Sequence, residues 1–273
     1  MWGSWVALLS GALFRRPVIL RCGVERYQNE LREPHSRLYF ILLRAICSLC
    51  YRFADRIILA SPAMAKFVTQ RFHIRPTKIQ VLPNYVDISS FRPLGYDTNG
   101  KLLFVGRLSP VKNIFALVDA VAKTDYELHI IGEGELSPAI EAHIRRVGAK
   151  AKLLGGVPHD ELPDLINRYA AFVLPSLYEG HPKALLEAMA CGVAVLGTDV
   201  PGIRPLIEDR HSGLLAHPDA DSLKAAITTL MTDSGLRRQL GANARAYATE
   251  HCDLNNISQR ELLLYHEATR AAR

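Results

Sequence analysis

The chain has 273 residues, of which 49% are hydrophobic and 22% charged, so it is neither a disordered chain nor a small disulfide scaffold. Its length is enough for two domains of common size. The 33 Lys and Arg residues outnumber the 27 Asp and Glu residues, and the net charge of +6 suits an anionic substrate, a membrane surface or nucleic acid, or a solvated basic surface without a partner.

The first part of the chain begins with residues 1–14, an apolar run without a charged side chain. The run is too short to span a bilayer, and basic residues follow it, whereas in a signal peptide they precede it. We predict a buried helix over residues 2–14, with an interfacial membrane contact as the alternative. Beyond it, the pattern predicts strands at 17–22, 56–59 and 78–82, and helices at 34–53 and 62–72.

The second part alternates strands and helices more regularly. Strands are expected at 101–105, 127–131, 152–154, 171–174, 193–197 and 213–215, and helices from Asn113 and at 137–147, 160–169, 182–190 and 220–231. This alternation predicts an α/β protein with a parallel, doubly wound sheet. Breaker-rich residues 91–100 precede it, so we expect one domain over 1–92 and a second over 93–253. The remaining residues, 254–273, are expected to form a helix that packs back toward the first domain.

The five cysteines are an odd number and lack the spacing of a disulfide framework, which favours a reducing, cytoplasmic location. Cys47 and Cys50 form a lone C-x-x-C pattern inside an apolar helix pattern, and we interpret them as core residues rather than as a redox or metal site. The histidines show no ligand spacing, so neither a metal nor a cofactor is expected.

Residues 179–191 are the most informative stretch. Glu179 closes a buried strand, Gly180 permits a sharp turn, and Pro182 suits the first position of a helix that carries Glu187. The first turn of that helix presents unpaired N–H groups and a positive dipole end, which favour a phosphate-like anion. Two carboxylates on either side of a bound anion can grip hydroxyl groups, and a nucleotide sugar has that shape.

Further candidate residues follow other strands of the second part. Arg107 offers a planar fork and Lys112 a point charge, and together they can neutralise a diphosphate or simply flank a surface turn. Gly132 lets a ligand approach the backbone or only makes a tight turn. His181 donates to a phosphate or sugar hydroxyl, or merely occupies a position that tolerates polarity.

These motifs, in this order, resemble the glycosyltransferase family 4 group, also called the glycosyl transferases group 1 domain, of the GT-B fold. The resemblance covers roughly residues 50–250. It is carried by residues 54–61, by the linker-like residues 81–91, by Gly106-Arg107-Leu108 with Lys112-Asn113, and by Glu179-Gly-His-Pro with Glu187-Ala-Met-Ala-Cys-Gly. It implies two Rossmann-like doubly wound domains, an N-terminal one on the acceptor side and a C-terminal one that binds the donor.

The resemblance further implies a retaining, metal-independent glycosyltransferase that moves a sugar from a nucleotide-diphosphate sugar to a glycan, lipid or small-molecule acceptor. Arg107 and Lys112 would bind the diphosphate and stabilise the leaving group, and Glu179 with the amides of residues 181–183 would hold the sugar. Glu187 would bind the ribose hydroxyls. The implied catalytic residues are Arg107, Lys112 and Glu179, and the implied donor-binding residues are Gly106, Gly132, Gly180, His181, Pro182, Lys183 and Glu187.

The chain departs from the family pattern at His181, where an aromatic residue is common, and at Tyr85, where a glycine is common. It also lacks the strand and glycine-rich loop with which the family's first domain normally begins, so we expect an incomplete N-terminal domain. Two alternatives follow: a non-catalytic nucleotide-sugar-binding protein or subunit that needs a partner chain, and an enzyme that hydrolyses or isomerises the nucleotide sugar. We expect no nucleic-acid partner, and a cytoplasmic location with a peripheral membrane contact as the alternative.

Overall fold

The computed structural model describes all residues except 1–3, 24–26, 28–29, 31–35, 96–99 and 272–273. The chain divides into two compact units: unit 1 comprises residues 1–84 with 255–273, and unit 2 comprises residues 85–254. The sequence predicts a boundary after Arg92, whereas the contacts place it after Asn84. The reason is that Val86 pairs with Asp253 in a parallel bridge and Phe91 is buried in the core of unit 2.

Unit 2 is built on a six-stranded parallel sheet with the strand order β6-β5-β4-β7-β8-β9. The strands are β4 (Leu102–Val105), β5 (Leu128–Ile131), β6 (Ala151–Gly155), β7 (Ala171–Leu174), β8 (Ala194–Thr198) and β9 (Leu214–Ala216). Strands β4 and β7 are buried at every residue, as in sheets that are covered on both faces. The order is that of a doubly wound nucleotide-binding domain, and it confirms the predicted fold class for this unit.

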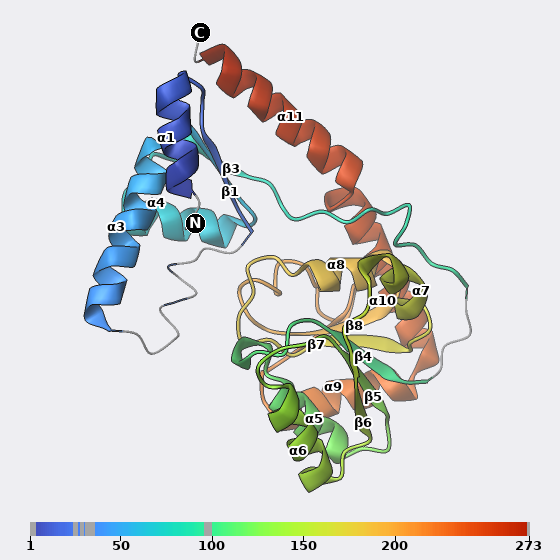
Figure 1. The fold of residues 1–273 in the computed structure, drawn as a ribbon. Coiled ribbons are helices and arrows are strands. Elements are labelled where there is room, and N and C mark those ends of the chain that lie inside the picture. The colour runs from blue at the N-terminus through green and yellow to red at the C-terminus, as the bar shows by residue number, and fades with distance from the viewer. Residues whose placement is uncertain (1–3, 24–26, 28–29, 31–35, 96–99, 272–273) are drawn as a thin grey trace. The chain divides into compact units, whose positions relative to one another are not determined.

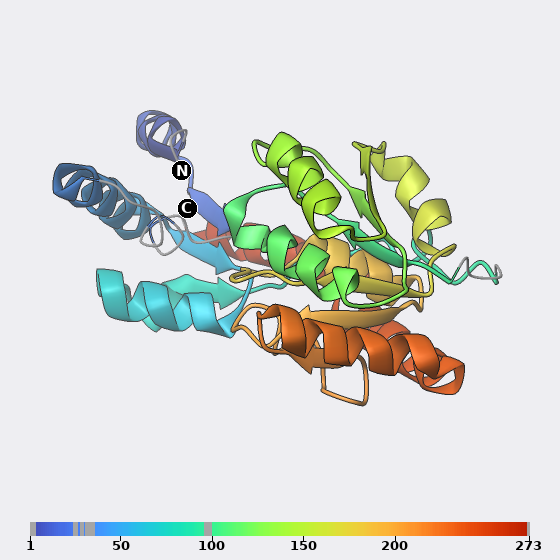
Figure 2. The same cartoon turned by 90° about the horizontal axis from the view of Figure 1, so that it is seen from below.

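Helices cover both faces of this sheet (Figure 1). On one face, α5 (Ile114–Ala122) packs against α6 (Ser137–Val147) and α9 (Ala220–Thr232), and Figure 2 shows these helices from below. On the other face, α8 (Lys183–Ala190) packs against α10 (Ser234–His251). The apolar side chains between these layers form one continuous core, which fixes the loops at the ends of the strands.

The helix predicted at residues 160–169 is shorter than expected. It consists of a 3₁₀ turn, His159–Glu161, followed by α7 (Leu162–Ile166). Asn167 ends this helix, because its side-chain amide donates to the carbonyls of Pro163, at 2.8 Å, and Arg92, at 2.9 Å. Its Oδ1 accepts from the backbone N–H of Leu94 at 2.8 Å. A side chain that ties the helix end to a distant segment is invisible to helical periodicity.

Unit 1 contains a three-stranded parallel sheet in the order β1 (Ile19–Cys22), β2 (Arg56–Leu59) and β3 (Ile79–Val81). Among the described residues of this unit, the α-helices with assigned bounds are α1 (Ser4–Phe14), α3 (Arg37–Phe53), α4 (Pro62–Phe72) and most of α11 (Leu254–Ala271). Arg21 of β1 forms an ion pair with Glu261 of α11. Cys47 and Cys50 are buried in the core of unit 1, in agreement with their interpretation as core residues.

The prediction that the N-terminal helix is buried is wrong. Helix α1 forms, but Trp5, Leu9 and Leu13 are 54%, 62% and 76% exposed. The helix is apolar all round, so only one stripe of it can face the core, where Leu8 is partly buried and Gly11 leaves room for Val18. Within the described part of the chain, no helix combines the length and the apolar character needed to cross a membrane.

Candidate active site

The strand order of unit 2 reverses between β4 and β7, and open α/β sheets bind ligands beyond the carboxyl ends of the strands at such a point. Residues 106–113 follow β4, and residues 175–182 follow β7. The two segments are joined directly, because the backbone N–H of Leu177 donates to the carbonyl of Val111 at 2.8 Å. The two strongest sequence motifs therefore meet at the switch point of the sheet.

The closest contact between the two motifs is an ion pair. Lys112 Nζ lies 2.5 Å from Glu179 Oε1, and the Ser176 hydroxyl donates to the same oxygen at 2.7 Å. The Lys112 side chain is 19% exposed and that of Glu179 is 10% exposed, so both are largely desolvated. Arg107 is exposed and forms no ion pair with any residue that the structure describes. Among the predicted catalytic residues, Lys112 and Glu179 are therefore in contact, whereas Arg107 has no ion-pair partner in the described part of the chain.

Two glycines bring neighbouring loops into backbone contact at this edge of the sheet. Gly132 has a φ of +132°, and a Cβ there would lie 1.9 Å from the carbonyl oxygen of Gly106. At Gly202, a Cβ would lie 1.9 Å from the carbonyl oxygen of Glu179. No other residue fits without displacing a loop. The glycines thus fix the backbone on which Glu179 and the start of the β4 loop depend.

Glu187 is buried in α8, where the sequence placed it. His159 Nε2 lies 2.8 Å from Glu187 Oε1, and Lys183 Nζ lies 3.9 Å from the same oxygen. Burial raises the pKa of the Glu187 carboxyl, while the contacts with His159 and Lys183 oppose that rise. The result is a desolvated carboxyl group whose orientation is set by an imidazole from another loop.

The start of α8 differs by one residue from the prediction. Pro182 is the N-cap, with a ψ of 114°, and Lys183 is the first helical residue. No side chain caps the N-terminus of this helix among the described residues. Gly180 and His181 precede it in buried positions, and burial lowers the pKa of His181 to about 4, so the ring is neutral at neutral pH. Lys183 lies over the ring of Tyr85 at 5.9 Å.

Three residues that organise the site were given no role from the sequence. His159 orients Glu187, and Ser176 supports Glu179. Asn113 donates through its side-chain amide to the carbonyls of Pro175, at 3.1 Å, and Pro218, at 2.9 Å, which links three loops. All three lie beyond the carboxyl ends of strands, which was the only sequence signal for His159 and Ser176, whereas Asn113 also stands in the Lys112-Asn113 motif.

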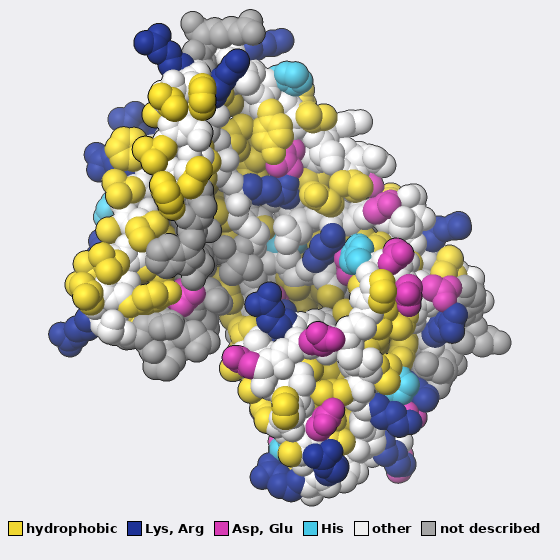
Figure 3. Space-filling view, in the orientation of Figure 1, with side chains coloured by type: hydrophobic (Ala, Val, Ile, Leu, Met, Phe, Trp, Pro, Cys, Tyr) yellow, Lys and Arg dark blue, Asp and Glu magenta, His cyan; other side chains and the backbone are white. Residues whose placement is uncertain are grey.

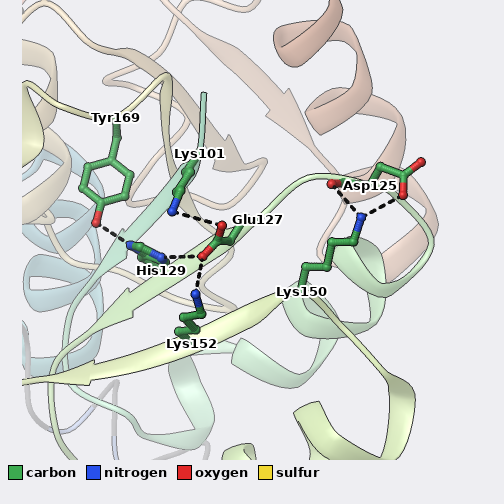
Figure 4. Close-up of polar contacts among 7 residues, drawn as sticks. All are labelled: Lys101, Asp125, Glu127, His129, Lys150, Lys152 and Tyr169. Carbon is green, nitrogen blue, oxygen red and sulfur yellow. Dashed lines mark hydrogen bonds and ion pairs between the residues drawn. The ribbon is translucent and has the colours of Figure 1, made fainter. Parts of the chain in front are cut away.

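A second polar cluster lies at the amino ends of the same sheet (Figure 4). Glu127 contacts Lys152 at 2.9 Å, Lys101 at 3.0 Å and His129 at 2.9 Å, and His129 also contacts the Tyr169 hydroxyl at 2.7 Å. Hydrogen bonds from Lys152, Lys101 and His129 hold the pKa of the Glu127 carboxyl at about 2. Because the one carboxylate of this cluster already contacts both lysines and the imidazole, we interpret the cluster as a structural one that joins strands.

Two family models match the chain. The model of the glycosyl transferases group 1 family matches residues 87–247, and that of Glycosyltransferase Family 4 matches residues 2–90. The first of these covers most of unit 2, including both motifs at the switch point.

The curated relatives of this chain include proteins that are named as glycosyltransferases. One is the N-acetylgalactosamine-N,N'-diacetylbacillosaminyl-diphospho-undecaprenol 4-alpha-N-acetylgalactosaminyltransferase of Campylobacter jejuni, 32% identical over 212 residues, or 74% of this chain and 58% of the relative. The alpha-maltose-1-phosphate synthase of Mycolicibacterium smegmatis is 28% identical over 247 residues, or 79% of this chain and 64% of the relative. The chain spans between 42% and 66% of the length of such relatives.

Solved structures share the fold at low sequence identity. Sucrose-phosphate synthase from Thermosynechococcus elongatus matches with a TM-score of 0.87 and 21% identity over 98% of this chain and 72% of that one. HepE from Anabaena, solved in complex with UDP-glucose, matches with a TM-score of 0.86 and 24% identity over 97% of this chain and 76% of that one. These matches confirm the predicted GT-B-like fold.

Proposed function

The chain belongs to the glycosyl transferases group 1 family, and we propose that it moves a sugar from a nucleotide-diphosphate sugar to a glycan or lipid acceptor with retention of anomeric configuration and without a metal ion. The observation that carries the proposal is the contact of Lys112 with Glu179 at the switch point of unit 2. It joins a diphosphate-binding motif to a sugar-binding one. The relative that acts on a diphospho-undecaprenol and the neighbour solved with UDP-glucose support this choice of acceptor and donor.

In the proposed reaction, negative charge grows on the diphosphate as the bond between sugar and phosphate breaks. Lys112 is already fixed in place by Glu179, and Arg107 is free to turn toward the phosphates. The uncapped amides at the start of α8 add a further fixed partial charge. Groups that are oriented before the reaction stabilise developing charge most effectively, so Lys112 and these amides lower the barrier without a separate reorganisation step, whereas Arg107 must first turn toward the phosphates.

The remaining site residues hold the donor. We assign Glu187 to the ribose hydroxyls, with His159 fixing the carboxyl that accepts their hydrogen bonds. Glu179 and the amides of residues 181–183 hold the transferred sugar, and the neutral ring of His181 adds no charge beside it. The acceptor oxygen attacks on the face that the diphosphate leaves, and the departing phosphate oxygen takes the acceptor's proton. This route retains the anomeric configuration without a protein nucleophile.

Metal independence rests on the two cations, which supply the charge that a divalent ion supplies elsewhere. Among the described residues, no three His, Cys, Asp or Glu side chains gather in the manner of metal ligands. Turnover of UDP-sugar measured with EDTA and with added Mg²⁺ tests this part of the proposal. Equal rates are expected, whereas a rate that requires Mg²⁺ contradicts it.

A second candidate is a nucleotide-sugar-binding subunit that needs a partner chain for transfer. It is favoured by the size of the sheet in unit 1, which has three strands in the described residues against six in unit 2. Both candidates keep the donor site of unit 2, so they differ in turnover and not in binding.

Calorimetry and turnover on the purified chain separate these candidates. UDP and GDP are titrated first, and transfer is then followed with UDP-sugars and lipid-linked or free glycan acceptors, with the anomeric configuration of the product read by NMR. Arg107→Gln is expected to weaken binding of the preferred diphosphate at least about tenfold, because a charge-assisted contact is lost. Lys152→Gln, a cation at the other end of the sheet, is the control. Binding without transfer supports the subunit, and no diphosphate binding rejects both candidates.

A further inference from the structure

Unit 1 exposes an apolar face formed by its helices α1 and α3. Six of its side chains, Leu9, Leu13, Phe14, Leu38, Ile41 and Phe53, are between 62% and 76% exposed. Figure 3 shows hydrophobic side chains gathered over these two helices, with Lys and Arg side chains at their margin. Large apolar side chains in such number rarely lie open to water unless the surface binds something. We call this surface the α1/α3 face.

Helix α3 is apolar on two sides. Leu43, Cys47 and Cys50 face the core of unit 1. Leu38, Leu42 and Leu49, spaced by four and seven residues, form a second stripe that is 53–64% exposed. Since one stripe is enough to anchor a helix on its domain, the second stripe needs another explanation.

A hollow lies within this face, and its lining is mostly apolar. Its volume is about 710 Å³, and Trp5, Leu9, Leu49 and Phe53 line it together with the first residues after α1. Arg15 and Arg16 also line it. An apolar hollow with guanidinium groups beside it has the two chemistries of a phospholipid, a hydrocarbon chain and an anionic phosphate.

The charge on this face has a single sign. Neither α1 nor α3 contains an acidic residue, whereas Arg37, Arg44 and Arg52 lie on α3 and Arg15 and Arg16 follow α1. These five arginines are exposed. Asp55, the one acidic residue that lines the hollow, is held by a 2.7 Å hydrogen bond from the backbone N–H of Val18.

The excess of basic over acidic residues extends beyond the two helices. Residues 1–84 carry 13 Lys and Arg residues against 4 Asp and Glu residues, whereas residues 85–254 carry 17 against 21. The excess positive charge of the chain therefore belongs to the part that bears the exposed apolar face. A surface on which apolar side chains lie beside basic ones, with no acidic residue on either helix, complements the charge of an anionic lipid bilayer.

We propose that the α1/α3 face docks on an anionic lipid bilayer, with the apolar side chains of α1 and α3 in the interfacial layer and Arg15 and Arg16 on lipid phosphates. Helices of this kind lie in the plane of the interface and bury their apolar side at the boundary of headgroups and acyl chains. The inference does not depend on the donor site, because none of the residues involved belongs to unit 2.

The experiment is vesicle co-flotation of the full chain with phosphatidylcholine vesicles that contain or lack phosphatidylglycerol. Tryptophan fluorescence adds a local readout, because the two tryptophans of the chain are Trp2 and Trp5, both in the N-terminal segment. Binding is expected only with phosphatidylglycerol, with a blue shift of the emission as Trp5 leaves water. Added salt is expected to weaken it, because screening reduces attraction to the lipid charge.

Two double variants test the two chemistries of the face. Leu13→Glu with Phe14→Glu is expected to reduce binding at least about a hundredfold, because two apolar anchors become charged. Arg15→Gln with Arg16→Gln is expected to reduce it about thirtyfold, since each basic side chain near such a surface contributes about 1 kcal/mol. The matched controls are Leu154→Glu, at an apolar residue that is 44% exposed in unit 2, and Arg145→Gln with Arg146→Gln on α6, which removes an equal charge.

Three outcomes would overturn the proposal. The chain could fail to bind either kind of vesicle, or bind both equally, or lose as much binding from the control variants as from those on the face. If the chain instead forms a dimer that Leu13→Glu dissociates, without vesicle binding, the face belongs to a second copy. Far-UV circular dichroism and thermal unfolding of each variant show whether unit 1 is still folded, and therefore whether loss of vesicle binding is loss of structure.

Discussion

The charged side chains at the two ends of the sheet in unit 2 differ in how completely they are paired. At the amino ends, Glu127 contacts Lys101, Lys152 and His129, and every charged group there has a partner of opposite sign (Figure 4). At the carboxyl ends, Arg107 is exposed and unpaired within the described residues, and Glu187 is buried with its pKa raised. The same sheet thus ends in a saturated cluster on one side and, on the other, in the residues that we propose bind the donor.

The difference shows which charges stabilise the fold and which await a ligand. The amino-end cluster ties β4, β5 and β6 together with contacts that gain little from another ion. At the carboxyl ends, Glu179 is held by Lys112, by the Ser176 hydroxyl and by the close packing of Gly202 against its carbonyl, whereas Arg107 has no ion-pair partner among the described residues. Substitutions at the two ends should therefore affect different measurements: turnover and binding at one, stability at the other.

The largest effect is expected at Lys112. Lys112→Met removes a pre-oriented cation from the proposed diphosphate site and leaves Glu179 without its partner. We expect kcat/KM to fall by about 10² to 10³, the loss typical of one fixed charge-stabilising group. The measurement is steady-state transfer with the preferred UDP-sugar, beside thermal unfolding. Lys152→Gln is the comparison at the other end, and a similar loss of turnover there would remove the distinction between the two ends.

The next effect concerns pH and His181. Burial lowers its pKa to about 4, from about 6.5 in an unfolded chain. As the pH falls from 6.5 toward 4, the unfolded chain binds a proton that the folded chain does not, so the free energy of unfolding decreases, by up to about 3 kcal/mol. The free energies of unfolding of the wild type and of His181→Gln, measured with urea at each pH across this range, should converge as the pH falls. Parallel curves would show that this ring does not titrate as its burial implies.

Much of this carboxyl end was predictable, because its signals are local. Strands β4 and β7 read as short apolar runs, and the motifs of Lys112 and Glu179 follow these two runs directly. The pairing of His159 with Glu187 was not predictable, since it depends on how two loops fold toward each other. The exposure of α1 was not predicted for a related reason. An apolar run indicates that a helix can be buried, but it does not indicate how much of the helix other elements cover.

A smaller effect is expected from the glycine that supports Glu179. Gly202→Ala places a Cβ 1.9 Å from the Glu179 carbonyl oxygen, so one of the two loops must move. We expect a loss of about 2 kcal/mol in the free energy of unfolding, as for other overpacked sites, and weaker UDP binding. Gly235→Ala in α10 is the control, because its Cβ would meet only the Asp233 side chain, and alanine favours a helix. Equal stability of the two variants would show that the loops at this edge are not held by close packing.

The smallest effect is expected at the amino end. Glu127→Gln removes the shared carboxylate, and because its partners are partly solvated we expect a loss of only about 1 kcal/mol at neutral pH. The folded pKa of about 2 lies below the ordinary value of 4.5, so this stabilisation is present above pH 4.5 and is lost as the pH falls toward 2. The free energies of unfolding of the wild type and the variant should therefore differ by a constant amount above pH 4.5 and converge as the pH falls toward 2. The difference between the wild type and His181→Gln, by contrast, should disappear between pH 6.5 and 4. Turnover should be unchanged, because solvent screens the partly exposed charges of this cluster from the opposite end of the sheet. A drop in kcat with stability intact would mean that the two ends are coupled and that the amino-end charges also serve the reaction.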